Sequence, residues 1–200
     1  MTYQLTKEEL RNNKTLREEF KNIKRNDIYI ILDSLKAAHN IGTILRLSDA
    51  LLVKKVYICG NTIVPPNRKI KDSSRGAERW VPWEYKSNAL EVAKELKKQG
   101  VQIVAVEVTN DSIEYVDYNP SDKVCLILGR EFDGVSQELL DIADYSIHLP
   151  LLGMCNSINV STAASVVLYD TYYKMKNKSE KIFEYSPSLY MLSVIVTNIL

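Results

Sequence analysis

IYIILDSLKAAHNIGTILRLSDALLVKKVYIC, residues 28 to 59, is the stretch that decides the fold class of this chain. It starts with the apolar, β-branched run 28–33 and ends with a second such run, 55–59, and both are typical of strands. Between them, residues 40–52 have the apolar spacing of a helix. A helix between two apolar strands is the repeating unit of a parallel sheet, so the stretch predicts an α/β fold.

The same alternation continues along the chain. The further predicted elements are strands at 101–108, 123–128 and 145–150 and helices at 87–99, 136–143 and 159–176. Strands that are apolar throughout are buried on both faces, which predicts a parallel sheet flanked by helices on both faces. Sheets of this kind bind ligands at the carboxyl ends of their strands.

The ends of the chain differ from its middle. Residues 1–26 carry seven basic and four acidic side chains around a thin apolar stripe, which predicts an exposed helical arm with a net charge of +3. Residues 27–177 hold all the predicted strands and are long enough to form one domain with a substantial core. Residues 178–200 are a C-terminal tail whose role the sequence does not indicate.

Charge and cysteine content narrow the classes of partner and site. Lys and Arg number 26 against 25 Asp and Glu, so an anionic partner must be met by a local patch. Such a patch is the segment 67–79, which holds five basic and two acidic side chains. The three cysteines, Cys59, Cys125 and Cys155, are far apart without a C-x-x-C pair, which predicts reduced, buried thiols and no metal site.

Neither end of the chain resembles a targeting or membrane segment. The first fourteen residues, MTYQLTKEELRNNK, are too charged for a secretory signal. The apolar run YMLSVIVTNIL near the C-terminus is about half the length that spans a bilayer. We therefore expect a soluble, cytoplasmic protein with no membrane partner.

The common phosphate-binding fingerprints are missing. No G-x-G-x-x-G follows the first strand, and no Gly-rich loop ends in Lys-Ser or Lys-Thr, which disfavours a nucleotide-dependent oxidoreductase. Four of the seven glycines, Gly42, Gly129, Gly134 and Gly153, instead follow predicted strands. This distribution puts permissive backbone where a ligand would approach.

The first polar cluster after a strand is HNIGTILR, residues 39–46. We expect Asn40 to cap the helix and Gly42 to allow another group to come close in its first turn. Arg46 is flanked by apolar residues and needs an anion, which is either a ligand or, in the structural alternative, Asp33 or Asp49.

Two further clusters follow later strands. In LGREFDG, residues 128–134, Glu131 either caps a helix or accepts hydrogen bonds from loop amides or ligand hydroxyls. In LPLLGMCNSINVS, residues 149–161, four polar side chains precede a buried helix although one suffices for a cap. We therefore expect some of these side chains to belong to a binding site.

Together the three clusters resemble the motifs of the SpoU or TrmH-type RNA ribose 2′-O-methyltransferases of the SPOUT superfamily. The motifs read Asn40-x-Gly42-x-x-x-Arg46, Leu128-Gly129-x-Glu131-x-x-Gly134 and Pro150-x-x-Gly153-x-x-x-Ser157-x-Asn159-Val160-Ser161. The resemblance covers residues 28–176, and segment 71–85 also looks like the family's stretch after the second strand. Ile158 replaces the usual Leu, a change that conserves volume.

The resemblance implies a C-terminal deep trefoil knot, a homodimer, and S-adenosylmethionine bound in the knot near the dimer interface. It places the adenosine against backbone at strand ends and knot loops. The implied cofactor-binding residues are Val106, Leu128, Gly129, Glu131, Gly134, Leu149, Gly153, Ser157, Ile158 and Asn159.

The resemblance also implies that Arg46 activates the ribose hydroxyl. A guanidinium stays protonated and cannot accept a proton, so we favour binding of a phosphate and stabilisation of alkoxide charge, with a base role as the alternative. Asn40 is implied to hold Arg46 or the RNA. Ser157 and Asn159 are implied to position the ribose or the methionine end of the cofactor.

The choice of RNA depends on surfaces outside the motifs. We expect phosphate binding by the basic segment. Its basic residues are Arg68, Lys69, Lys71, Arg75 and Arg79. Because about 26 residues before the first strand cannot form an RNA-binding domain, we favour tRNA, with a D-loop guanosine as the leading target. Ribosomal RNA and a wobble-position ribose remain alternatives, as does a non-catalytic RNA-binding protein on the same fold.

Overall fold

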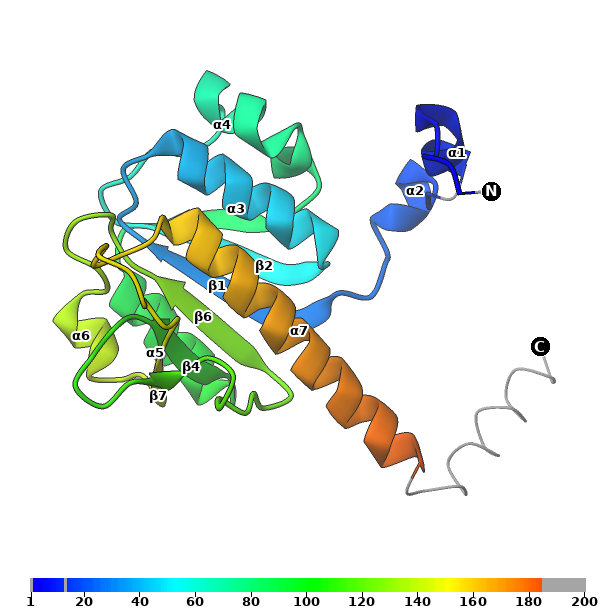
Figure 1. Ribbon diagram of the computed structural model, residues 1–200. Helices are drawn as coiled ribbons and strands as arrows, with labels where there is room; N and C mark the ends of the chain where they lie inside the picture. The colour runs from blue at the N-terminus through cyan, green and yellow to red at the C-terminus, as the bar shows by residue number, and fades with distance from the viewer. Residues whose placement is uncertain (1, 13, 185–200) are drawn as a thin grey trace.

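A seven-stranded parallel sheet forms the centre of the computed structural model, which describes residues 2–12 and 14–184 (Figure 1). The strand order is β3-β2-β1-β6-β4-β7-β5, and every neighbouring pair is parallel. The strands are β1 Asn26–Asp33, β2 Val53–Cys59, β3 Trp83–Lys86, β4 Gln102–Val106, β5 Ile113–Glu114, β6 Val124–Leu128 and β7 Tyr145–His148. The predicted parallel sheet is confirmed.

Helices cover both faces of this sheet. The helices α3 (Ala38–Ala50) and α7 (Val160–Glu184) pack on one face, with α4 (Arg68–Ser74) against α3. The helices α5 (Ala89–Lys98) and α6 (Gln137–Leu140) pack on the other. Two separate apolar cores result, one on each face, because the central strands are buried on both sides.

The structure adds short elements and moves some boundaries. The strands β3 and β5, the helix α4 and the 3₁₀ turn η1 (Ala77–Arg79) were not predicted, because β5 and η1 are only two and three residues long and β3 and α4 contain no apolar run. The strand β4 ends at Val106, two residues before its predicted end. The helix α3 starts at Ala38, two residues before the predicted start, so the predicted cap at Asn40 lies inside the helix.

The N-terminal arm consists of two short helices instead of one, α1 (Lys7–Asn12) and α2 (Arg17–Phe20). The rings of Phe20 and Trp80 meet edge to face at 5.9 Å, which attaches α2 to the domain. At the other end, α7 continues to Glu184, past the predicted boundary at residue 177. The rest of the predicted tail, including its apolar run, lies outside the described residues.

Within the described residues, no helix combines the length and the apolar composition that a membrane span requires. No group of three His, Cys, Asp or Glu side chains within residues 2–12 and 14–184 is placed to hold a metal ion. The predicted cytoplasmic location stays a prediction.

Candidate active site

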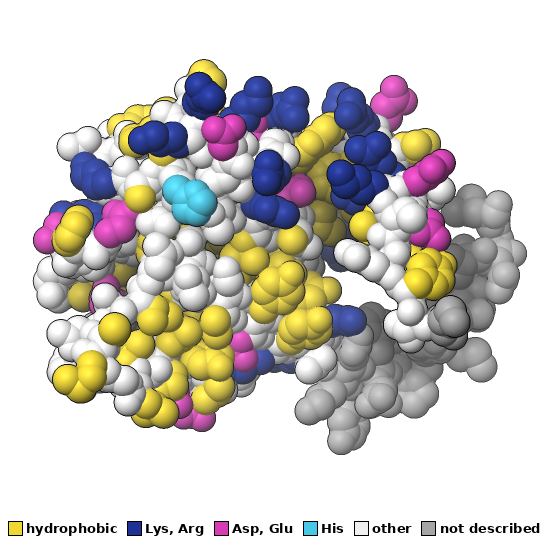
Figure 2. Space-filling model, turned by 45° about the horizontal axis from the view of Figure 1, so that its top comes forward, with side chains coloured by type: hydrophobic (Ala, Val, Ile, Leu, Met, Phe, Trp, Pro, Cys, Tyr) yellow, Lys and Arg dark blue, Asp and Glu magenta, His cyan; other side chains and the backbone are white. Residues whose placement is uncertain are grey.

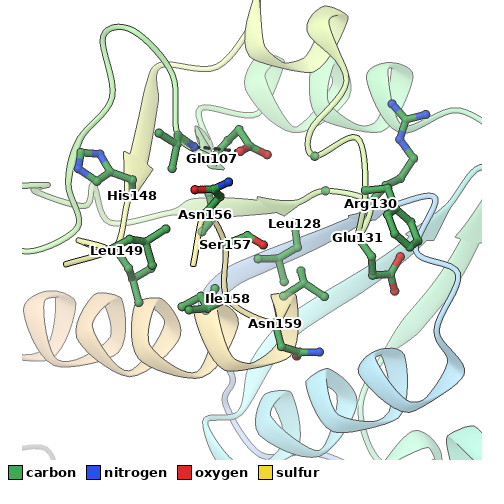
Figure 3. Close-up of a pocket in the computed structure, with 18 of the residues that line it drawn as sticks. Glu107, Leu128, Arg130, Glu131, His148, Leu149, Asn156, Ser157, Ile158 and Asn159 are labelled. Carbon is green, nitrogen blue, oxygen red and sulfur yellow. Dashed lines mark hydrogen bonds between the residues drawn. The ribbon is translucent and has the colours of Figure 1, made fainter. Parts of the chain in front are cut away.

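A pocket of about 540 Å³ lies at the carboxyl ends of β4, β6 and β7, where a parallel sheet is expected to bind ligands (Figure 3). Figure 3 shows side chains from separate segments around one space, among them Glu107, Leu128 and Ser157. Nine of the ten residues predicted to bind a cofactor line it: Val106, Leu128, Gly129, Glu131, Gly134, Leu149, Ser157, Ile158 and Asn159. Gly153 does not line it, and a Cβ there would meet nothing within 4 Å.

The loop after β6 folds back on itself, and its glycines make this possible. The backbone N–H groups of Arg130 and Gly134 donate to each other's carbonyl oxygens at 3.0 and 3.1 Å. A Cβ on Gly129 would lie 2.2 Å from the backbone of Gly134 and Val135. Gly129 therefore admits the chain's own loop, which in turn brings backbone groups to the edge of the pocket.

Glu131 ties this loop to the start of α3. Its carboxylate accepts hydrogen bonds from the backbone N–H of Lys36 (3.1 Å) and Ala37 (2.9 Å) and from Nδ2 of Asn40 (3.0 Å). Burial by itself would raise the pKa of the Glu131 carboxyl, but these donors together lower the pKa below its usual value. Of the two roles predicted for Glu131, the structure shows hydrogen bonding to loop amides within the same chain.

Asn40 joins two motifs and caps no helix. The N-cap of α3 is Ala37, which has no side-chain cap, so the predicted capping role of Asn40 is wrong. Asn40 is buried, and its Oδ1 accepts from Nδ2 of Asn159 at 3.1 Å while its Nδ2 donates to Glu131. The three motifs therefore meet in one hydrogen-bonded chain, Glu131–Asn40–Asn159.

Asn159 is also the cap of α7. Its Oδ1 accepts from the backbone N–H of Ser161 (2.9 Å) and Thr162 (3.4 Å) and from the Ser161 hydroxyl (2.6 Å). The cap thus uses Asn159 and Ser161, whereas Asn156 and Ser157 line the pocket together with Asn159. The surplus of polar side chains in this segment is explained by the pocket, which needs more of them than the cap does.

Arg46 lies apart from Asn40. Gly42 faces α4 so closely that a Cβ there would lie 2.5 Å from the Ile70 carbonyl oxygen. Arg46 follows Gly42 by about one turn and so lies near the same side of α3, whereas Asn40 lies about 120° from Arg46 around the helix axis. The amide of Asn40 bonds Glu131 and Asn159 and makes no hydrogen bond to Arg46 among the described residues. Its predicted alternative role, holding the RNA, stays a prediction.

The predicted salt bridge from Arg46 to Asp33 or Asp49 is also not formed. Arg46 is exposed, and it forms no ion pair with Asp33 or Asp49 in the described part of the chain. Asp33 instead accepts from the backbone N–H of Ser136 at 3.2 Å. A guanidinium without an intramolecular anion is available to an anionic ligand.

Several residues that line the pocket were not predicted, among them Glu107 and His148. Glu107 accepts from the backbone N–H of Val108 and of Val135, both at 3.0 Å, and so links β4 to the loop after β6. Nδ1 of His148 lies 3.0 Å from the Ser112 hydroxyl. Both residues stand at strand ends, the position that indicates a ligand site in a parallel sheet. Glu107 was not recognised because the strand was predicted to continue to residue 108, which placed Glu107 inside it.

The basic segment forms α4 and the turn after it. Asn67 caps α4 by accepting from the backbone N–H of Lys69 and Ile70 at 2.9 and 3.2 Å. All five predicted RNA-binding cations are exposed: Arg68, Lys69, Lys71, Arg75 and Arg79. Figure 2 shows Lys and Arg side chains gathered over the top of the molecule, where α4 and α3 lie in Figure 1. We call α4 and η1 with these cations the basic face.

The cysteines only partly match their prediction. Cys59 and Cys125 are buried, and burial raises the pKa of the Cys59 thiol to about 12. Cys155 is exposed in the loop between β7 and α7, so its predicted burial is wrong. The apolar flanks that suggested burial, Met154 and Leu152, are themselves almost fully exposed.

Two curated tRNA methyltransferases are similar to this chain in sequence. A tRNA (guanosine(18)-2′-O)-methyltransferase of Aquifex aeolicus is 32% identical over 177 residues, which cover 88% of this chain and 81% of the relative. The Escherichia coli K12 enzyme of the same name is 28% identical over 76% of this chain and 65% of its own length. The chain thus spans slightly less than two thirds of that second relative.

A solved structure and a family model complete the similarities. The crystal structure of the SpoU methyltransferase AviRb from Streptomyces viridochromogenes, in complex with the cofactor AdoMet, superposes with a TM-score of 0.70. The match covers 78% of this chain and 63% of AviRb at 22% identity, which shows a shared fold. The model of the SpoU rRNA methylase family matches residues 27–169. With its motifs joined at one pocket and most of its length matched, the chain belongs to the SpoU rRNA methylase family.

Proposed function

We propose that this protein is an S-adenosylmethionine-dependent RNA methyltransferase that methylates a ribose 2′-hydroxyl, with a D-loop guanosine of tRNA as the favoured target. One observation carries the proposal. Residues of three motifs that are 91 and 119 positions apart meet in the chain Glu131–Asn40–Asn159, at a pocket of cofactor size. Such convergence places polar groups where a ligand of the sheet would bind.

The residues present fit S-adenosylmethionine. The pocket volume lies within the range of small-molecule sites, and apolar side chains from three strands and the following loop form a wall for a purine. These wall residues are Val106, Leu128, Ile147, Leu149 and Ile158. The carboxylates of Glu107 and Glu131 favour a cationic ligand. When bound, the cofactor supplies a methyl group on a sulfonium centre.

The chain's own residues bind and orient the reactants. Asn159 is fixed by Asn40 and by its cap on α7, so its side chain has one orientation. Ser157 lines the pocket and offers a hydroxyl to the ribose or to the methionine end of the cofactor. Arg46 binds an RNA phosphate and stabilises the charge that develops on the 2′-oxygen, because a guanidinium keeps its proton.

The proposal includes the knot and a homodimer. Val166, Tyr169 and Tyr173 form an exposed apolar stripe along α7, and Leu152 and Met154 are exposed in the preceding loop. Figure 2 also shows hydrophobic side chains gathered in the lower part of the view, away from the basic face. A second copy of the chain packed on this surface would cover these side chains and stand beside the pocket.

Two alternatives remain for the substrate class and activity. Ribosomal RNA is favoured by the description of the family, whereas tRNA is favoured by the names of the Aquifex and Escherichia coli relatives. A non-catalytic RNA-binding protein would not need the polar chain at the pocket. The presence of Arg46, Glu131 and Asn159 together therefore supports an enzyme.

The test measures transfer of a labelled methyl group from S-adenosylmethionine into total tRNA and, separately, into ribosomal RNA. The Arg46→Ala variant is compared with the unaltered protein, and the product is mapped by the alkaline resistance of the modified linkage. We expect label at a 2′-O position in tRNA, reduced at least about 100-fold by Arg46→Ala. Binding of S-adenosylmethionine should be unchanged in the variant, because Arg46 does not line the pocket.

Other outcomes separate the alternatives. Label in ribosomal RNA alone would move the substrate to the alternative. Binding of RNA without binding of S-adenosylmethionine would contradict the enzyme and support the non-catalytic protein. Equal activity of the Arg46→Ala variant would contradict the role given to Arg46.

A further inference from the structure

The two tryptophans of the chain have different surroundings. Trp80 is covered by the N-terminal arm, with the Phe20 ring at 5.9 Å and the Arg17 guanidinium 5.8 Å from its ring centre. Trp83, at the start of β3, is half-buried, and its indole N–H donates to the Glu78 carbonyl oxygen at 3.0 Å. Trp83 has no ring or cation packed on it among the described residues; it lines a second pocket instead.

This second pocket, of about 520 Å³, lies between the loop after β2, α4 and β3 and shares no lining residue with the candidate active site. We call it the Trp83 pocket. Its apolar walls are Trp83, Pro65 and Pro66. Three cations line it as well, Arg68, Lys71 and Arg79, together with Asn67 and the carboxylate of Glu78.

The combination of a flat aromatic side chain and several cations fits a nucleotide. Unpaired bases stack on aromatic side chains, and Lys and Arg beside them bind the connecting phosphates. The Arg68 side chain is 95% exposed, and its Nε lies 3.8 Å from Oδ2 of Asp72. Such an exposed ion pair is weak, so a phosphate can replace the Asp72 carboxylate. The chemistry of the walls and rim thus selects an unpaired nucleotide over a double helix.

Glu78 adds a preference among bases. Its side chain is only 12% exposed, and one carboxylate oxygen accepts from the Ser74 hydroxyl. The other oxygen, Oε1, forms an ion pair with Arg79 at 4.0 Å from its Nε, a distance that is too long for a hydrogen bond, so this contact does not use the oxygen's capacity to accept one. A carboxylate accepts only from donors, and guanine presents both an imino N–H and an amino group on one edge.

We propose that the Trp83 pocket binds one unpaired base of the RNA substrate, stacked on Trp83, with guanine preferred through Glu78 and the flanking phosphates bound by Arg68, Lys71 and Arg79. The proposal rests on the proposed function in that the ligand is a nucleotide of the RNA. It assigns recognition of the substrate to a site separate from the pocket where methyl transfer would occur.

The first test uses tryptophan fluorescence. The full-length Trp80→Phe variant keeps an aromatic ring against Phe20 and leaves Trp83 as the single tryptophan. GMP, AMP, UMP and an unmodified tRNA transcript are titrated into it at low salt. We expect tRNA to quench the emission of Trp83 through stacking. GMP should quench at lower concentration than AMP, a purine of similar size that has an amino group but no imino N–H to donate to Glu78.

The second test separates recognition of RNA from chemistry. The exposed rim is altered by Lys71→Gln and Arg79→Gln, which leave the half-buried Trp83 in place. For the double variant we expect the KM for tRNA to rise about tenfold, with kcat and S-adenosylmethionine binding unchanged. Lys98→Gln, on α5 at the other face of the sheet, is the matched control and should leave all three quantities unchanged.

Failure of this inference is distinguishable from failure of the proposed function. If the Trp80→Phe protein methylates tRNA while neither tRNA nor GMP quenches Trp83, the inference is overturned and the proposed function stands. If tRNA and GMP quench Trp83 but no RNA is methylated by the unaltered protein, the proposed function fails and the nucleotide site stands. Equal quenching by GMP and AMP would overturn the role of Glu78.

Discussion

The candidate active site and the basic face are built in opposite ways. At the site, the side chains of Asn40, Glu131 and Asn159 are fixed by hydrogen bonds between residues up to 119 positions apart. On the basic face, the cations project into solvent from one short helix and one turn. The first arrangement suits a reaction that depends on geometry, and the second suits a flexible polyanion.

This difference has a physical reason. Methyl transfer requires the acceptor oxygen to lie in line with the sulfonium, so a displaced oxygen lowers the rate of the transfer. Binding of phosphates depends on the number of charges nearby and tolerates movement of long side chains. Substitutions at the site should therefore change folding stability and cofactor binding, whereas those on the basic face should change mainly the salt dependence of RNA binding.

The largest expected effect concerns two motif glycines. Gly129→Ala should lower the free energy of unfolding by about 3 kcal/mol, because its Cβ would meet backbone at 2.2 Å. Gly153→Ala is the matched control and should stay within about 0.5 kcal/mol, since no atom lies within 4 Å of its Cβ. Urea denaturation checks both. Equal effects would mean that the loop after β6 is no more rigid than the loop before α7.

The next effect is the coupling between Asn40 and Asn159. Asn159→Ala should cost about 1–3 kcal/mol, because the buried Asn40 loses a hydrogen bond. Asn40→Ala should cost a similar amount, because it removes the hydrogen bonds to both Glu131 and Asn159. In a double-mutant cycle the coupling energy should be about 1 kcal/mol, and S-adenosylmethionine should bind more weakly to all three variants. If the losses in free energy of unfolding of the two single variants simply added in the double variant, the proposed coupling between Asn40 and Asn159 would be contradicted.

A smaller effect concerns the pH dependence of stability. The pKa of Glu131 is lowered in the folded state, so its contribution is fully present above the ordinary pKa of 4.5. It is lost as the pH falls through the lowered folded-state pKa. Glu131→Gln should therefore be less stable than the unaltered protein by about 1 kcal/mol at pH 7, and this difference should shrink as the pH falls below 4.5. Denaturation at a series of pH values measures it, and a difference that stays constant as the pH falls would contradict the link.

The smallest effect on stability is expected on the basic face. Lys69→Gln should change the free energy of unfolding by less than about 0.5 kcal/mol, because the side chain is exposed. It should reduce the slope of log affinity for tRNA against log salt concentration by about one. Filter binding at several salt concentrations measures the slope. An unchanged slope would remove Lys69 from the RNA-binding surface.

The fold class and most of the pocket were predictable, because long apolar strands and sequence-local motifs have visible patterns. The five long strands and their carboxyl-end loops follow from residues such as those of 28–33 and 123–128. The elements β3, β5 and α4 were not, since β5 has two residues and the sequences of β3 (WEYK) and α4 (RKIKDSS) contain no apolar run. Glu107 was not recognised because the strand was predicted to end two residues too late, so that Glu107 was assigned to the strand instead of the loop after it.

Apolar patterns and motif spacing are sufficient to predict the parallel sheet, the three motifs and the position of the basic segment. The folded chain was needed to show that Asn40 hydrogen-bonds with Glu131 and Asn159, that Arg46 lies on a different side of α3 from Asn40, and that Trp83 lines a pocket. The reason is that periodicity and motif spacing are local properties of the chain. Side-chain partners across 91 or 119 residues depend on strand order and helix packing, which no local pattern specifies.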